Sequence, residues 1–236
     1  MRGVLTRWVV PVRCAGCRRQ PAHLCCHCLT TLQFALPFCL ICDQYSPHGL
    51  IHKTCTHLTI QHISLFYYNH VARNLLKLYK KKPYKAYAQA FNQLLKYYLH
   101  FDPFYLTQKI PNNNVSIIYP ASTRSKSLGY DHIKILVPLV AQGFNIRNWK
   151  TVAAYRSKKQ AKQLKTIKSK TKRAEFLLRH SYTIRPKALR PHSNILIIDD
   201  VTTTSVTLLS LVNAVINSGV PFKSITTFTF FKVRLN

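Results

Sequence analysis

Four pairs of potential metal ligands lie between residues 14 and 55, and two residues separate the members of each pair. The pairs are Cys14 with Cys17, Cys25 with Cys28, Cys39 with Cys42, and His52 with Cys55. A pair at this spacing can form a turn that directs two ligands at one ion. Two such turns complete a tetrahedral shell of four cysteines, or of three cysteines and a histidine. The eight ligands therefore predict two structural zinc sites, with Cys26 left over.

The assignment of pairs to ions has two solutions, because sequential and interleaved pairing both satisfy the ligand count. We expect sequential pairing, since the short gap from Cys17 to Cys25 closes with little loss of loop entropy. All 8 cysteines of the chain fall in this segment. In a reducing compartment such clustering favours metal binding over disulfides. His52 is the one non-cysteine ligand, and His48 and His57 lie nearby.

A second motif joins an apolar strand, residues 195–198, to two acids and a loop rich in hydroxyl groups. Ligands of parallel α/β sheets bind beyond the carboxyl ends of the strands, where this loop must lie. Backbone N–H groups and hydroxyls at a helix N-terminus can hold a phosphate, and adjacent carboxylates can accept hydrogen bonds from a sugar diol. An ordinary helix cap would explain only one acid and one hydroxyl. The motif predicts a sugar-phosphate site formed by Asp199, Asp200, Thr202, Thr203, Thr204, Ser205 and Thr207.

The elements that must position these residues alternate between strand and helix. Helical patterns cover 71–99, broken near Pro83, and also 132–142 and 206–217; strand patterns cover 115–119, 195–198 and 225–233. This alternation predicts a parallel α/β sheet. The pattern changes after Thr56, so we expect a small module in residues 1–58 and an α/β domain in residues 59–236.

The charge of the chain limits its partners. It has 35 Lys and Arg against 6 Asp and Glu, a formal charge of +29, which favours a polyanion such as nucleic acid. No stretch approaches the roughly 18 apolar residues of a spanning helix. Residues 5–12 are too short for a signal sequence and contain Arg7. We therefore expect a cytoplasmic protein with no membrane span.

Much of the positive charge lies in one run, residues 156–173, which holds nine cations and no anion. Repulsion between like charges three and four residues apart destabilises a helix, so this segment should need a polyanion to become ordered. The alternatives are a solvated surface, or contact of Lys158 and Lys159 with pyrophosphate. On a helix, one face would carry the predicted contacts to single-stranded DNA: Lys158, Lys162, Lys165, Lys168 and Lys172.

These motifs together resemble the ComF/GntX family, the competence-protein-F-like phosphoribosyltransferases. Residues 195–207 are similar to the phosphoribosyl pyrophosphate (PRPP) loop of type I phosphoribosyltransferases, with Ser205 at the usual glycine position. The stretch 119–124, followed by 129–132, resembles the family's pyrophosphate region, which assigns Ala121, Ser122, Thr123 and Arg124 to the pyrophosphate loop. The ligand pairs resemble the family's double zinc ribbon, with His52 in place of a cysteine.

The resemblance implies a type I phosphoribosyltransferase-like parallel sheet with helices on both faces, preceded by a small zinc-ribbon module. It also implies binding of PRPP with magnesium, and a role in natural transformation in which the chain handles incoming single-stranded DNA in the cytosol. DNA-uptake or recombination proteins would then be partners. The alternative is an active phosphoribosyltransferase that acts on an amine or nucleobase. No catalytic residue can be assigned from the sequence.

Overall fold

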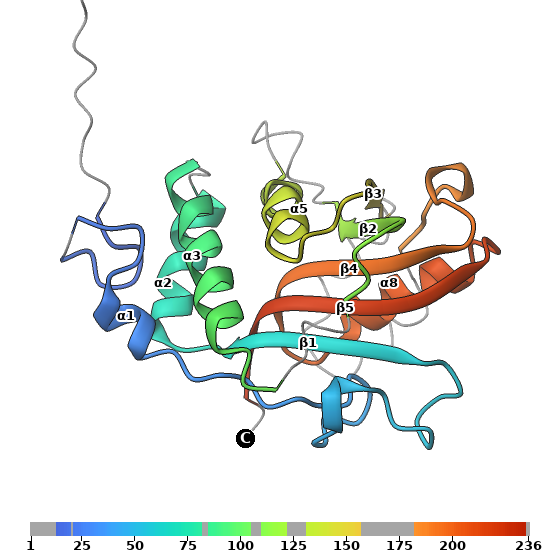
Figure 1. Cartoon of the computed structure of the whole chain (residues 1–236), viewed down its shortest axis with the longest axis horizontal. Coiled ribbons are helices and arrows are strands. Elements are labelled where there is room, and N and C mark those ends of the chain that lie inside the picture. Colours follow the sequence, from blue (N-terminus) through green and yellow to red (C-terminus); the bar gives the residue numbers. More distant parts are fainter. Residues whose placement is uncertain are drawn as a thin grey trace, which may run out of the picture.

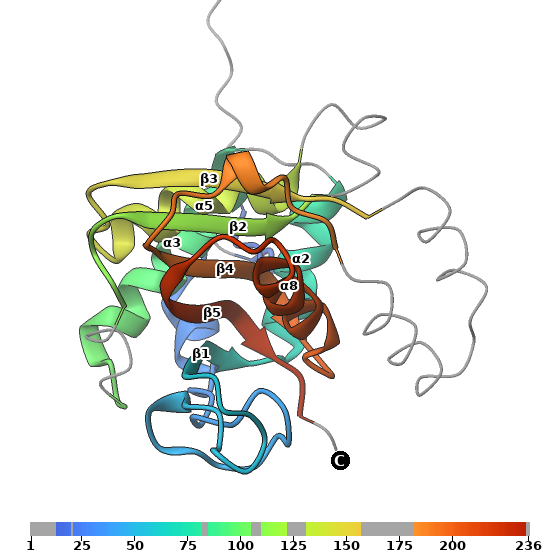
Figure 2. The ribbon, with the colours of Figure 1, turned by 90° about the vertical axis from the view of Figure 1, so that its right-hand side faces the viewer.

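The centre of the chain is a five-stranded sheet in which every strand runs parallel to its neighbours. The computed structural model describes residues 13–19, 21–81, 85–104, 110–121, 131–156 and 182–234. The strands are β1 (Ile60–Tyr67), β2 (Val115–Pro120), β3 (Trp149–Ala154), β4 (Ser193–Thr202) and β5 (Phe222–Lys232). Their spatial order is β1-β5-β4-β2-β3, as Figure 2 shows. The predicted parallel α/β sheet is confirmed.

Helices cover both faces of this sheet. One face packs against α2 (His70–Lys81), α3 (Lys85–Phe101) and α5 (His132–Gly143), and the other against α8 (Val206–Ile216). Successive side chains of a strand point to opposite faces. In β4, Ile195 and Ile197 accordingly enter the core under α8, whereas Leu196 and Ile198 enter the core under the other three helices. The described chain also has a short helix, α1 (Cys26–Thr30), and two 3-10 turns, η1 (Pro47–Gly49) and η3 (Pro186–Ala188).

The chain reverses its direction of travel across the sheet between β2 and β4. After β2 it crosses through α5 to β3 on one side, and after β4 it crosses through α8 to β5 on the other. The two strands are neighbours, with Val115 opposite Asn194 and Ile118 opposite Ile197. Such a switch point leaves a crevice at the carboxyl ends of the two strands, where ligands of open α/β sheets bind.

The N-terminal segment packs along β1, at one edge of the sheet (Figure 1). Its backbone bonds to the outer side of β1: Tyr67 N–H donates to Gln33 O at 2.8 Å, and Ile51 N–H donates to Ile60 O at 2.9 Å. Leu24 joins the core beneath α2 and α3, and Leu40 joins the core beneath α8. The described residues contain no helix with the length and apolar character needed to cross a membrane.

Candidate functional site

The structure groups the eight predicted metal ligands into two clusters by sequential pairing. Cys14, Cys17, Cys25 and Cys28 form the first cluster; Cys39, Cys42, His52 and Cys55 form the second. The ligand atoms of each cluster all lie within 4.8 Å of one another. Cys26 belongs to neither cluster and is exposed. Either cluster could therefore hold a zinc ion.

Distances within the clusters fit tetrahedral coordination. Zinc–sulfur bonds of about 2.3 Å place two sulfur ligands about 3.8 Å apart, and a sulfur and a histidine nitrogen about 3.5 Å apart. Cys17 Sγ and Cys25 Sγ are separated by 3.7 Å in the first cluster. Cys42 Sγ and His52 Nδ1 are separated by 3.3 Å in the second. The donor set and its spacing therefore suit zinc, and Nδ1 is the ring nitrogen of His52 that faces the cluster.

The first turn of each cluster has the same backbone construction. Arg18 N–H donates to Cys14 O at 2.8 Å, and Asp43 N–H donates to Cys39 O at 2.9 Å. Arg18 and Asp43 both adopt the left-handed conformation, with φ of 61° and 62°. The two Cys-x-x-Cys turns are thus one local structure that occurs twice.

Backbone N–H groups also point at the sulfur atoms in both clusters. Cys25 N–H donates to Cys14 Sγ at 3.3 Å, and His52 N–H donates to Cys39 Sγ at 3.5 Å. Gly16 allows the first turn to close, because a Cβ atom there would lie 2.6 Å from Cys28 Sγ. Such N–H donors favour the thiolate form that binds a metal.

The predicted sugar-phosphate loop lies at the carboxyl end of β4, the neighbour of β2 at the switch point. Thr203 and Thr204 are exposed, Thr207 is half-buried, and Thr202 is buried. Ser205 precedes α8 in the left-handed conformation, with φ of 57°, and its side chain makes no capping hydrogen bond to the helix. The N–H groups of the first turn of α8 therefore receive no side-chain cap from this residue and could bind an anion.

The two acids of this motif have different surroundings. Asp200 is 3% exposed, and its carboxylate lies 2.6 Å from Lys80 Nζ at the end of α2. His132 Nε2, at the start of α5, lies 3.7 Å from the same oxygen. Burial lowers the pKa of His132, although the negative charge of Asp200 opposes that shift. The Asp200 carboxylate is thus paired with a cation, on the face of the sheet that α2 and α5 cover.

Asp199 is half-buried and accepts a hydrogen bond from the N–H of Asp200 at 2.9 Å. Burial, with repulsion from Asp200, raises the pKa of Asp199 to about 7. Arg156 and Tyr182 lie within electrostatic range of this carboxylate. The Arg156 guanidinium stacks over the Tyr182 ring, 4.1 Å from its centroid. Asp199 can therefore exchange a proton near neutral pH.

Several predicted residues lie outside the part of the chain that the structure describes. In the pyrophosphate loop these are Ser122, Thr123 and Arg124. The remaining residue of that loop, Ala121, is described: it follows β2, and its N–H donates to Ala154 O at 2.9 Å. The predicted DNA contacts outside the description are Lys158, Lys162, Lys165, Lys168 and Lys172.

The residues that flank positions 157–181 are described and meet at the carboxyl edge of the sheet. Tyr155 and Thr183 form an antiparallel bridge, with N–H to O distances of 3.0 and 2.8 Å in the two directions. Tyr155 and Thr183 therefore lie side by side just beyond the end of β3.

Sequence reasoning assigned no role to Lys80, His132 or Arg156. His132 falls in a stretch that resembles the family and Lys80 in a predicted helix, but nothing in either stretch signals a contact with Asp200. A scan against models of known protein families finds no match, and no curated protein matches the chain by sequence.

Proposed function

We propose that this chain binds a PRPP-type sugar phosphate at the carboxyl edge of β2 and β4, and that it binds single-stranded DNA through its basic surface. The observation that carries the first half is the adjacency of β2 and β4 at the switch point. The loops assigned to pyrophosphate and to ribose phosphate follow these two strands. Two motifs 75 or more residues apart in the sequence thereby begin at the ends of neighbouring strands.

The conformation of Ser205 supports a phosphate cradle. In the family that this chain resembles, a glycine occupies this position, and glycine adopts positive φ without strain. Ser205 adopts the same left-handed region at φ of 57°. The backbone turn that such a loop requires is thus present although the residue that favours it is absent. Thr203 and Thr204, both exposed, offer hydroxyls beside it.

Asp199 is the stronger candidate for a ribose contact. Its carboxylate is half-buried, whereas that of Asp200 is already bonded to Lys80. On this basis Asp199 accepts a hydrogen bond from the sugar diol. Asp200 holds Lys80 and His132 at the edge of the proposed sugar-phosphate site. Magnesium would arrive bound to the diphosphate of the ligand, which supplies oxygen ligands of the kind it prefers.

The DNA-binding half of the proposal is supported by charge and by the position of the basic segment. The formal charge of +29 favours polyanions, and the nine-cation run begins at Arg156, just after β3. With the resemblance to competence-protein-F-like proteins, these features make handling of incoming DNA during natural transformation the proposed role.

The test of the sugar-phosphate site is calorimetric titration with PRPP and magnesium. Changing Asp199 and Asp200 together to Asn removes charge-assisted hydrogen bonds, each worth about 1.5 to 3 kcal/mol, so affinity should fall at least tenfold. The matched control is Asp102→Asn, the same chemical change beyond the end of α3. Unchanged PRPP affinity in the double variant would place the site elsewhere.

A second candidate is an active phosphoribosyltransferase, favoured by the pKa of Asp199, which lies near 7. A carboxylate that titrates near the working pH is suited to general acid–base catalysis. Release of pyrophosphate from PRPP in the presence of amine or nucleobase acceptors distinguishes this candidate from binding alone.

A further inference from the structure

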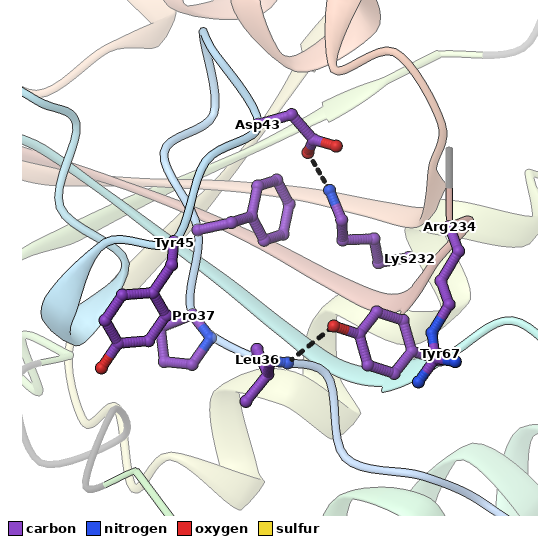
Figure 3. A pocket seen from close by; sticks show the side chains of 8 residues that line it. Leu36, Pro37, Asp43, Tyr45, Tyr67, Lys232 and Arg234 are labelled. Atoms are coloured by element: carbon purple, nitrogen blue, oxygen red, sulfur yellow. Dashed lines mark hydrogen bonds and ion pairs between the residues drawn. The ribbon is translucent and has the colours of Figure 1, made fainter. Parts of the chain in front are cut away.

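Two cavities open near the carboxyl ends of β1 and β5, where the N-terminal segment passes the edge of the sheet. The first, of about 290 Å³, is lined by Leu36, Pro37, Tyr45, Tyr67 and Arg234, among others (Figure 3). The second, of about 420 Å³, is lined by Gln33, Tyr68 and His70, and again by Tyr67 and Arg234. Because Tyr67 and Arg234 line both cavities, the two are neighbouring parts of one groove.

The shared pair is held in place by its own contacts. The guanidinium of Arg234 stacks on the Tyr67 ring, 4.0 Å from its centroid, and its Nη2 donates to Gln33 Oε1 at 2.9 Å. The Tyr67 hydroxyl accepts a hydrogen bond from Leu36 N–H at 3.3 Å. A guanidinium carries five N–H donors in a plane that matches a phosphate. Arg234 is thus a positioned cation with donors beyond the one that Gln33 engages.

The groove has a positive balance of charge. Among the described residues that line it, Asp43 is the only acid. Asp43 forms an ion pair with Lys232, which is 5% exposed and lies 3.2 Å from the centroid of the Phe38 ring. Lys232 therefore neutralises the acid, and the charge of Arg234 is left to attract an anion.

Apolar surface is exposed beside this cation. Tyr45 is 63% exposed and Leu36 is 52% exposed. In Figure 3, Tyr45 and the Tyr67–Arg234 pair lie on opposite sides of the first cavity, with Leu36 and Pro37 between them. A flat ring open to water, across one cavity from a fixed cation, is a combination on which unpaired nucleic-acid bases stack.

We propose that this groove binds single-stranded nucleic acid, with a phosphate at Arg234 and a base stacked on Tyr45. The inference rests on the proposed affinity for single-stranded DNA and adds a second contact surface to residues 156–173, which follow β3 in the sequence. Each cavity is at the lower end of the roughly 300 to 1,000 Å³ range of small-ligand pockets, which suits single nucleotide units. An acidic peptide would satisfy Arg234 but would leave the Tyr45 ring uncovered.

The experiment measures binding of a fluorescent oligo(dT) by anisotropy over a series of salt concentrations, with the whole zinc-loaded chain. The variants are Arg234→Gln, Tyr45→Ser and Tyr45→Phe. The matched control is Arg147→Gln, which removes the same charge from an exposed position before β3, at the opposite edge of the sheet. Zinc content and the unfolding midpoint of each variant show whether its fold is intact.

Stacking on one aromatic ring is worth about 1 to 3 kcal/mol per base, so Tyr45→Ser should weaken binding at least fivefold, whereas Tyr45→Phe should retain it. Arg234→Gln should reduce the slope of log affinity against log salt by about 0.7, the share of one phosphate contact. Arg147→Gln should change affinity less than twofold and leave the slope unchanged.

Three outcomes would overturn the inference. If the parent binds oligo(dT) and both Tyr45→Ser and Arg234→Gln bind like the control, the groove is not the site, although the proposed DNA binding stands. If an acidic peptide of equal charge competes as well as oligo(dT), the groove recognises charge alone. If the parent binds no oligo(dT) even at low salt, the proposed DNA binding and the groove fail together.

Discussion

Replacing Ser205 with glycine should stabilise the protein and tighten PRPP binding. Ser205 has φ of 57°, and the left-handed conformation costs a residue with a Cβ atom about 1 to 2 kcal/mol. Glycine removes that cost but adds about 0.4 to 1 kcal/mol of chain entropy to the unfolded state. The hydroxyl that is lost makes a long contact of 3.4 Å with Thr202 and caps no helix. We expect a net gain in unfolding free energy of up to about 1.5 kcal/mol.

Urea unfolding measures the stability, and calorimetry with PRPP and magnesium measures the binding. Two controls separate the causes. Ser205→Ala loses the hydroxyl but keeps the Cβ atom, so it should retain the strain. His192→Gly relieves another left-handed residue, with φ of 53°, at the amino-terminal end of β4. It should stabilise the fold to a similar extent and leave PRPP affinity unchanged.

The result that would refute this reasoning is a Ser205→Gly variant no more stable than Ser205→Ala. Backbone strain at the start of α8 would then be negligible. A variant that is more stable but binds PRPP no better would show that the turn is strained without limiting the phosphate cradle.

Other predictions concern metal, charge and pH. Elemental analysis should find two zinc ions per chain, and Cys14→Ser should lower the count to one. Charge-neutral substitution of Lys158, Lys162, Lys165, Lys168 and Lys172 should reduce the salt slope of DNA binding by about 3.5, and an unchanged slope would exclude the basic run as the contact surface. Because the pKa of Asp199 is raised on folding, stability should fall as pH rises from about 4 to about 7, and Asp199→Asn should remove that decline in urea titrations. Chelation of zinc should speed amide exchange in β1 more than in β4.

The sequence predicted the elements whose apolar pattern is plain. The strands expected at 115–119, 195–198 and 225–233 correspond to β2, β4 and β5, and the break near Pro83 separates α2 from α3. The helix expected at 132–142 corresponds to α5, because apolar residues recur there at helical spacing. These features depend on local sequence alone.

Two strands were missed because their patterns are not those of a buried strand. β1 carries Gln61, His62 and Ser64, all buried, at positions where a sequence reading expects apolar residues. His62 is satisfied by Thr227 Oγ1 at 2.7 Å and by Ser64 Oγ at 2.8 Å, a network that only the pairing of β1 with β5 creates. β3 is an edge strand with mostly half-buried side chains, so its apolar signal is weak.

The candidate site was predictable where ligands are close in sequence and not where they are distant. The spacing of the cysteines was enough to propose two four-ligand clusters. The cation beside Asp200 comes from α2, 120 residues earlier, and no local pattern links Lys80 to that carboxylate. Charge neutralisation within the site is a property of the tertiary structure.

The position of the two metal clusters gives them a role in the sheet as well as in their own loops. β1 is an edge strand, and an uncovered edge presents unpaired N–H and C=O groups to other chains. Here the segment that leads into the second cluster and the stretch between its two ligand pairs cover that edge, through the bonds of Gln33 to Tyr67 and of Ile51 to Ile60. The cysteines of the first cluster pack in the core beneath α2 and α3, whereas Cys39 packs in the core beneath α8. Metal binding at the two clusters would therefore fix the cover of β1 from both faces of the sheet, which couples the N-terminal segment to the strand beside the proposed nucleic-acid groove.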